Sequence, residues 1–131
     1  MYHLTPAKAG DRGSAVADFV MVGALLSVVF VALLQVGLTL YVRNTLISCA
    51  SEGARLGARA DADPGEGVAR TRQLIDSTLS RRFGEQVTAR VVMADGVRVL
   101  SVRVVAPLPV IGLLGAGQHF DVVGRAFLER Q

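Results

Sequence analysis

Residues 19–42 read FVMVGALLSVVFVALLQVGLTLYV and contain no Asp, Glu, Lys, Arg or His. At about 1.5 Å of rise per residue the segment makes roughly 36 Å of helix, which is enough to cross roughly 30 Å of hydrocarbon. A buried core helix would need a protein that surrounds it on every side, and the rest of a 131-residue chain is too small for that. The segment therefore predicts a transmembrane helix.

The flanks of this segment predict that it is retained as an anchor. The N-terminal stretch carries Lys8 and Arg12 against Asp11, and basic residues beside a first helix tend to stay in the cytoplasm. A cleaved secretory signal has a shorter apolar core with small residues directly behind it, whereas Arg43 follows here. We expect a single-pass protein with its N terminus inside and its C-terminal part outside.

The single cysteine raises a second possibility for this anchor. The sequence LISC, which ends at Cys49, resembles a bacterial lipobox. In lipoproteins the apolar core runs directly into the cysteine, but Arg43 and Asn44 interrupt it here. We interpret Cys49 as a small apolar residue on a helix, and a lipoprotein lipidated at Cys49 is the less favoured alternative.

Composition and spacing argue against several classes of function. The net charge is +3, and basic residues alternate with acidic ones without forming a patch, so nucleic acid is not an expected partner. His3 and His119 are far apart, Cys49 has no neighbouring histidine, and no metal-ligand spacing or phosphate-binding loop is present. We expect no enzymatic activity, no cofactor and no metal.

A short motif precedes the apolar segment. The sequence RGSAVADF places Gly13 before Ser14, with an acid at Asp18 and an aromatic residue at Phe19. It resembles the processing site of type IV pilin precursors, in which cleavage follows a glycine and an acid stands at the fifth mature position. The nearest pattern is that of the TadE-like pilins or pseudopilins of tight-adherence (Flp) pilus systems, which usually have glutamate where this chain has Asp18.

The resemblance continues beyond the membrane segment, where four residues look like the family's helix extension: Glu52, Gly53, Ala54 and Arg55. It implies a minor pilin or pseudopilin, a structural component of pilus assembly in the bacterial inner membrane or the pilus, cleaved after Gly13. The implied partners are other pilins or pseudopilins bound through the N-terminal helix, a prepilin peptidase and an inner-membrane secretion platform. The alternative is an unprocessed single-pass binding module of the cell envelope.

Asp18 has two interpretations. Cleavage after Gly13 would create an α-amino group on Ser14, and in the pilin analogy this group offsets the Asp18 carboxylate of a neighbouring subunit. An unpaired carboxylate in a membrane is expensive, which favours such pairing. Otherwise Asp18 lies among lipid headgroups or is stabilised by the helix N terminus.

The remaining sequence predicts an α+β, pilin-like chain in three parts. Residues 1–13 form a basic cytoplasmic leader, residues 14–60 the transmembrane helix with its outward extension, and residues 61–131 a head outside the membrane. Gly53 and Gly57 have the spacing of a small-residue packing motif, but that motif is best attested inside apolar spans. We interpret these glycines as a weakening of the helix toward its end.

The head is predicted to hold one amphipathic helix and a sheet of about three antiparallel strands. Residues 65–83 have apolar positions at helical spacing, and Gly84 is a natural stop. Val-rich stretches follow on either side of Asp95-Gly96, a good hairpin signal, and residues 119–130 form a third strand. The helix is expected to pack on one face of the sheet. The apolar loop 107–117 is either core beneath the sheet, which we favour, or an exposed patch for a partner.

Overall fold

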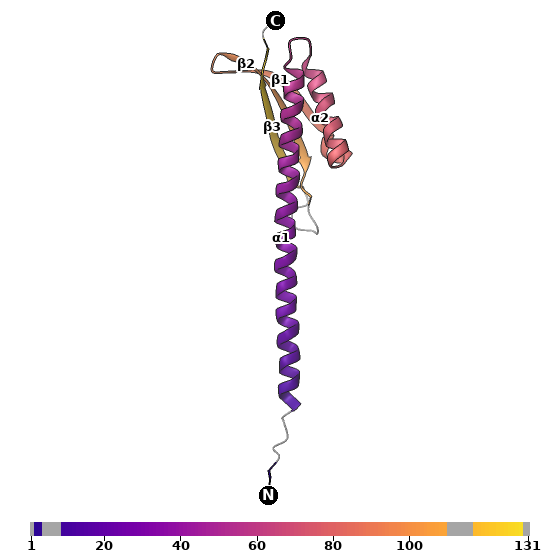
Figure 1. Cartoon of the computed structure of the whole chain (residues 1–131), viewed down its shortest axis with the longest axis vertical. Coiled ribbons are helices and arrows are strands. Elements are labelled where there is room, and N and C mark those ends of the chain that lie inside the picture. The colour runs from indigo at the N-terminus through magenta and orange to yellow at the C-terminus, as the bar shows by residue number, and fades with distance from the viewer. Residues whose placement is uncertain (1, 4–8, 110–116, 130–131) are drawn as a thin grey trace. The chain divides into compact units, whose positions relative to one another are not determined.

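The computed structural model of the chain describes residues 2–3, 9–109 and 117–129. Its elements follow in the order α1 (Ala9–Gly57), α2 (Pro64–Thr78), the 3₁₀ helix η1 (Arg81–Gly84), β1 (Gln86–Ala94), β2 (Val97–Pro107) and β3 (His119–Phe127) (Figure 1). The predicted α+β class is confirmed. The chain falls into two compact units, Met1–Val36 and Gly37–Gln131, whose boundary lies within α1.

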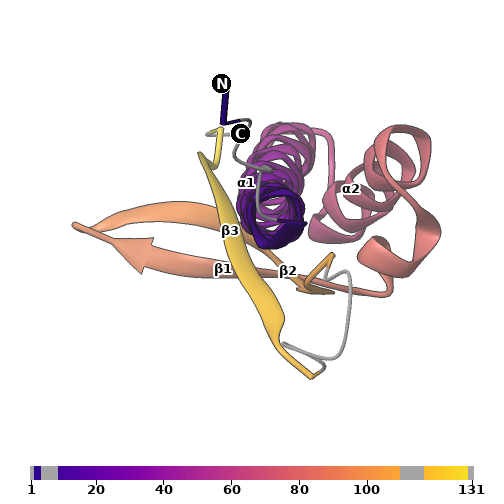
Figure 2. The ribbon, with the colours of Figure 1, turned by 90° about the horizontal axis from the view of Figure 1, so that it is seen from below.

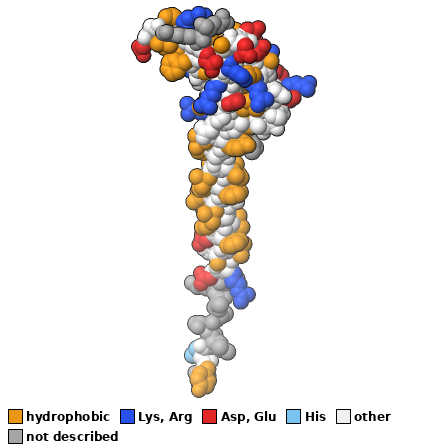
Figure 3. Space-filling model, turned by 45° about the horizontal axis from the view of Figure 1, so that its top comes forward, with side chains coloured by type: hydrophobic (Ala, Val, Ile, Leu, Met, Phe, Trp, Pro, Cys, Tyr) orange, Lys and Arg blue, Asp and Glu red, His pale blue; other side chains and the backbone are white. Residues whose placement is uncertain are grey.

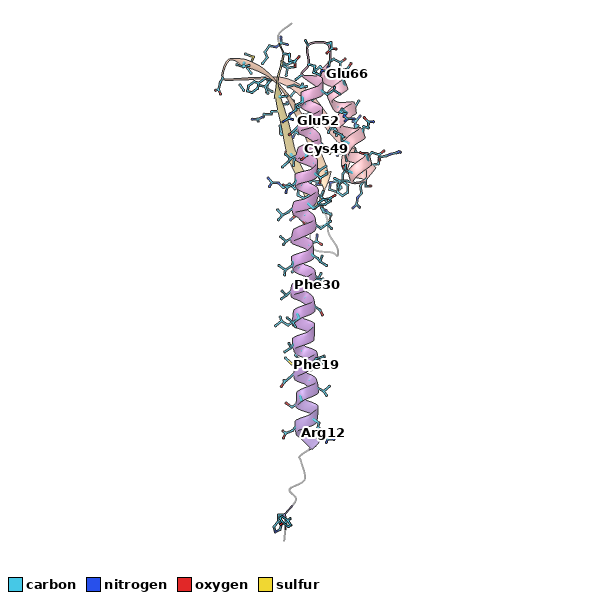
Figure 4. The ribbon with its side chains drawn as sticks, viewed as in Figure 1. Arg12, Phe19, Phe30, Cys49, Glu52 and Glu66 are labelled. Carbon is cyan, nitrogen blue, oxygen red and sulfur yellow. The ribbon has the colours of Figure 1, made fainter. Side chains whose placement is uncertain are left out.

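In the first unit, α1 is covered with apolar side chains. Its most apolar window has a mean hydropathy of 2.6 and none of it is buried. Figure 3 shows apolar side chains along the visible face of this helix, and Figure 4 shows side chains projecting outward from it. The Ser27 hydroxyl donates to the Gly23 carbonyl oxygen at 2.8 Å, so this polar group is satisfied within the helix. By length and composition α1 is a candidate transmembrane helix, as predicted.

The second unit contains an antiparallel sheet with the strand order β1-β2-β3. β1 and β2 form a hairpin in which Ala94 lies opposite Val97. The two turn residues, Asp95 and Gly96, have φ angles of 51° and 78°, as a tight two-residue hairpin turn requires. The predicted hairpin and third strand are confirmed.

Two helices cover one face of this sheet, where the sequence predicted only one. Figure 2 shows α2 and the C-terminal part of α1 on the same side of the sheet. Buried residues of α1 recur at helical spacing and enter the core: Val42, Leu46, Cys49, Ala50 and Ala54. The β2 side chains that meet the helices are Leu100, Val102, Val104 and Ala106, all with no exposed surface. The helix extension is therefore part of the head.

The glycines near the end of α1 allow close helix contact. A Cβ at Gly53 would overlap Thr71 Oγ1 and lie 2.6 Å from the Gly67 carbonyl oxygen. A Cβ at Gly57 would lie 2.7 Å from Leu100 Cδ2 and 3.0 Å from Gly67 Cα. The predicted end of the helix does come at Gly57. The packing role that the sequence analysis set aside is also present, because Gly53 and Gly57 are the positions at which α2 and β2 pack against α1.

α2 is shorter than the predicted helix over residues 65–83. It begins after Asp63, whose Oδ1 accepts a hydrogen bond from the Glu66 amide at 2.9 Å, with Pro64 in the first turn. It ends at Thr78, and the predicted stop at Gly84 instead closes η1. Phe83 still reaches the core and is 5% exposed.

Most of the apolar loop predicted over residues 107–117 consists of residues 110–116, which lie outside the described residues. On its N-terminal side, Leu108 packs against the core, and its amide donates to the Gln118 carbonyl oxygen at 3.2 Å. The predicted boundaries at residues 13/14 and 60/61 concern membrane topology and stay a prediction.

The packing of Gly53 predicts a difference between two identical substitutions in α1. Gly53→Ala should destabilise the head by about 1–3 kcal/mol because the added methyl overlaps α2. Gly37→Ala, with no atom within 4 Å of the new methyl, should be neutral or stabilising by up to about 1 kcal/mol through helix propensity. Unfolding of the full chain in detergent, followed by labelling of the buried Cys49 thiol, measures both. Equal stability of the two variants would contradict the packing role.

Candidate functional site

The processing-like motif lies on the exposed surface of α1. Gly13, Ser14, Asp18 and Phe19 are all helical and exposed, and the Phe19 side chain is 79% accessible. Ser14 and Asp18 are four residues apart, so they lie on the same side of the helix. A Cβ at Gly13 would meet nothing within 4 Å. Packing of the described residues therefore does not require the glycine.

Hydrolysis of the Gly13–Ser14 bond would require a local opening of the helix. α1 begins at Ala9, so this bond lies in its second turn. The first amides of a helix lack intrahelical partners, and helix ends fray. Gly10 and Gly13 each weaken the helix by up to about 1 kcal/mol relative to alanine. The chain is thus easiest to unwind next to the motif.

The helix-extension motif divides into two pairs. Gly53 and Ala54 are buried, whereas Glu52 and Arg55 are exposed. Glu52 is labelled in Figure 4. Both charged residues belong to α1, and the described residues offer neither of them an ion pair. Gly53 admits α2 and Ala54 belongs to the core, whereas the charged pair is free to meet solvent or another chain.

Cys49 is buried on the same stretch of α1. Its Sγ lies 3.9 Å from Thr78 Oγ1, and its burial raises the pKa of the thiol. Lipidation at Cys49 would remove residues 1–48, including Val42 and Leu46, which are 3% and 0% exposed in the core. The structure thus supports the interpretation of Cys49 as a packed apolar residue and counts against the lipoprotein alternative.

The face of the sheet away from the helices carries a charged pair that the sequence analysis did not identify. Arg103 Nε donates to Asp121 Oδ1 at 2.7 Å, and Arg103 Nη2 pairs with Asp121 Oδ2. Hydrogen bonding to Arg103 lowers the pKa of Asp121, and the same contact raises the pKa of Arg103. The residues are 18 apart in sequence, so only the β2–β3 register places them together.

A cavity of about 700 Å³ opens where the α1–α2 turn, the hairpin tip and the residues after β3 meet. Both basic and acidic side chains line this cavity, including Arg59, Arg98, Asp63 and Glu129. The Glu129 amide donates to the Ala58 carbonyl oxygen at 3.0 Å, which ties the end of the described chain to α1. Within the described ranges, no group of three or more His, Cys, Asp and Glu side chains is arranged to hold a metal.

One comparison with known proteins gives a match. The family model described as TadE-like protein matches residues 13–55. This range begins at Gly13 and ends at Arg55, so it contains both predicted motifs. No curated protein and no solved structure matches the chain. The predicted resemblance is confirmed over this segment, and together with α1 it supports a membrane-anchored component associated with a Tad pilus.

The Arg103–Asp121 pair predicts a pH effect of definite sign. The folded-state pKa of Asp121 is lowered, so its contribution to stability is present above the unfolded-state pKa. That contribution is lost as the pH falls through the folded-state pKa. Arg103→Gln should return the pKa of Asp121 toward its ordinary value, as measured by NMR titration of the carboxyl carbon. Arg125→Gln, on the same sheet face, is the matched control and should leave it lowered. A titration of Asp121 unchanged by Arg103→Gln would contradict the pairing.

Proposed function

Because the TadE-like match begins at Gly13, we propose that this chain is a minor pilin or pseudopilin of a tight-adherence pilus. In this proposal α1 anchors the precursor in the bacterial inner membrane, with Lys8 and Arg12 on the cytoplasmic side. A prepilin peptidase cleaves after Gly13, and the chain then acts at an inner-membrane secretion platform. Its role is structural rather than enzymatic.

The observation that carries this proposal is the combination of the motif with unpacked apolar surface. Residues 19–36 expose large apolar side chains on every side, and none of the most apolar window is buried among the described residues. Such a surface has to face lipid or other apolar helices. Pairing with other pilins or pseudopilins through α1 would cover it once subunits assemble.

Asp18 gives the assembly proposal an electrostatic component. Cleavage would leave an ammonium group on Ser14, and the Asp18 carboxylate is exposed on the same side of α1. A carboxylate near hydrocarbon is stabilised by a nearby cation. We propose that the Ser14 ammonium of one subunit offsets the Asp18 carboxylate of the next subunit.

The intact mass of the chain extracted from membranes tests the processing step. Loss of residues 1–13 supports cleavage, whereas a full-length mass supports the unprocessed envelope module. Gly13→Leu should leave the chain at its precursor mass because the side chain blocks close approach of the peptidase to the backbone. Gly23→Leu is the matched control, since both sites have open space around them. It should still be cut, and cutting of Gly13→Leu would place the cleavage elsewhere.

Substitution of Asp18 tests the pairing step. Asp18→Ala should leave membrane insertion intact, because it makes the segment more apolar, but it should impair pilus assembly. Asp18→Glu should leave assembly intact, because it keeps the carboxylate on the residue type that the family usually has at this position. Asp11→Ala is the control, since residue 11 is removed with the leader. Piliation counted by electron microscopy measures all three, and normal piliation with Asp18→Ala would exclude a pairing role.

A further inference from the structure

The face of the sheet away from α1 and α2, here called the open face, is basic. Residues that alternate with the buried ones on the three strands point away from the helices. Among them are Arg90, Arg103 and Arg125, against one acid, Asp121. Arg103 is neutralised by Asp121. Two arginines on this face are therefore left without an acidic partner among the described residues.

These two arginines lie in one row across the sheet. Arg90 is directly opposite Ser101, and Ser101 is directly opposite Arg125. Residues opposite each other on neighbouring strands have Cβ atoms about 5 Å apart, so the guanidinium groups flank the serine on a rigid surface. Five donors on each guanidinium can reach carboxylates of a partner.

The neighbouring row is apolar: its central residue, Val99, is 4% exposed, and the residues on either side of it are more accessible. Val92 lies opposite Val99, and Val99 lies opposite Phe127. Phe127 is 73% exposed, although it is a large aromatic residue. Arginine and aromatic residues together are enriched in protein–protein interfaces. The open face thus has the composition of a docking surface for an acidic partner.

The chain itself presents an acidic segment of matching charge. Residues 61–66, which span the turn between α1 and α2 and the start of α2, read DADPGE and contain three carboxylates and no basic side chain. Asp63 is occupied in capping α2. Asp61 and Glu66 are exposed and have no ion pair among the described residues. They lie on a different part of the head from the open sheet face.

We propose that the open sheet face binds the acidic α1–α2 turn of a second copy of this chain. Asp61 and Glu66 of one copy would meet Arg90 and Arg125 of the next. The two patches are different, so the contact is heterologous and leaves one patch of each kind free at the ends of the array. This goes beyond the proposed function, because it concerns the heads alone and does not depend on cleavage after Gly13.

Cysteine crosslinking of the uncut full chain in detergent tests this contact. Ser101→Cys lies between the arginines, and Ala62→Cys lies in the acidic turn. A mixture of the two variants should give a disulfide-linked heterodimer, and a chain with both cysteines should give a ladder. Gln73→Cys, on the exposed side of α2, replaces Ala62→Cys as the matched control and should not crosslink. Cys49 is buried, and its failure to react reports that each head is folded.

Charge reversal identifies the groups responsible. Arg90→Glu with Arg125→Glu on the Ser101→Cys chain should lower the crosslinking rate by about tenfold or more, since like charges then face each other. Asp61→Arg with Glu66→Arg on the Ala62→Cys chain should have the same effect, and combining both reversals should restore the link. Added salt should weaken the wild-type contact. Arg55→Glu with Arg72→Glu is the control reversal and should change nothing.

Several outcomes would overturn the proposal. Crosslinking no greater than with Gln73→Cys would show that the heads do not meet in this way. Preferential linking of Ser101→Cys to itself would indicate a symmetric contact instead. Loss without rescue in the double reversal would show that these charges do not face each other. The arginine row would be assigned to a different partner if charge reversal at Arg90 and Arg125 left crosslinking between copies unchanged but abolished binding of a separate acidic protein.

Discussion

The exposed apolar side chains of residues 19–41 have to be kept from water, and this requirement limits where the first part of the chain can lie. No face of this part of α1 is polar enough to be left in solvent. A helix that is apolar on all sides belongs in lipid or among other apolar helices. Its backbone groups are satisfied internally, as a membrane demands. The first unit is therefore incomplete as an isolated chain in water.

The same helix takes a different role from Val42 onward. There its buried residues face one side and become core, while Arg43 and Glu52 stay exposed. Close approach is possible because glycines occur where elements cross: Gly53 and Gly57 meet Gly67 on α2, and a Cβ at Gly124 on β3 would overlap the backbone at Ala50. Small residues thus position both α2 and the sheet against α1.

The processing-like motif has no part in these packing contacts. Gly13 and Asp18 are exposed, and no packing of the described residues accounts for a glycine within the helix. Gly10, Gly23 and Gly37 on the same helix also have open space around them, so the special place of Gly13 comes from the motif that surrounds it. The family match begins at this same residue. The motif and the match together support the cleavage that we propose after Gly13.

The sequence by itself determined the anchor, the hairpin and the family resemblance, because each rests on local information. Continuous hydropathy specifies a membrane segment, Asp95-Gly96 specifies a turn, and RGSAVADF is a contiguous motif. Only the tertiary structure decided the role of Gly53 and Gly57, the pairing of Arg103 with Asp121, and the alignment of Arg90 with Arg125. These depend on helix crossing and strand register, which join residues far apart in the chain, and no local pattern encodes which distant residues will meet.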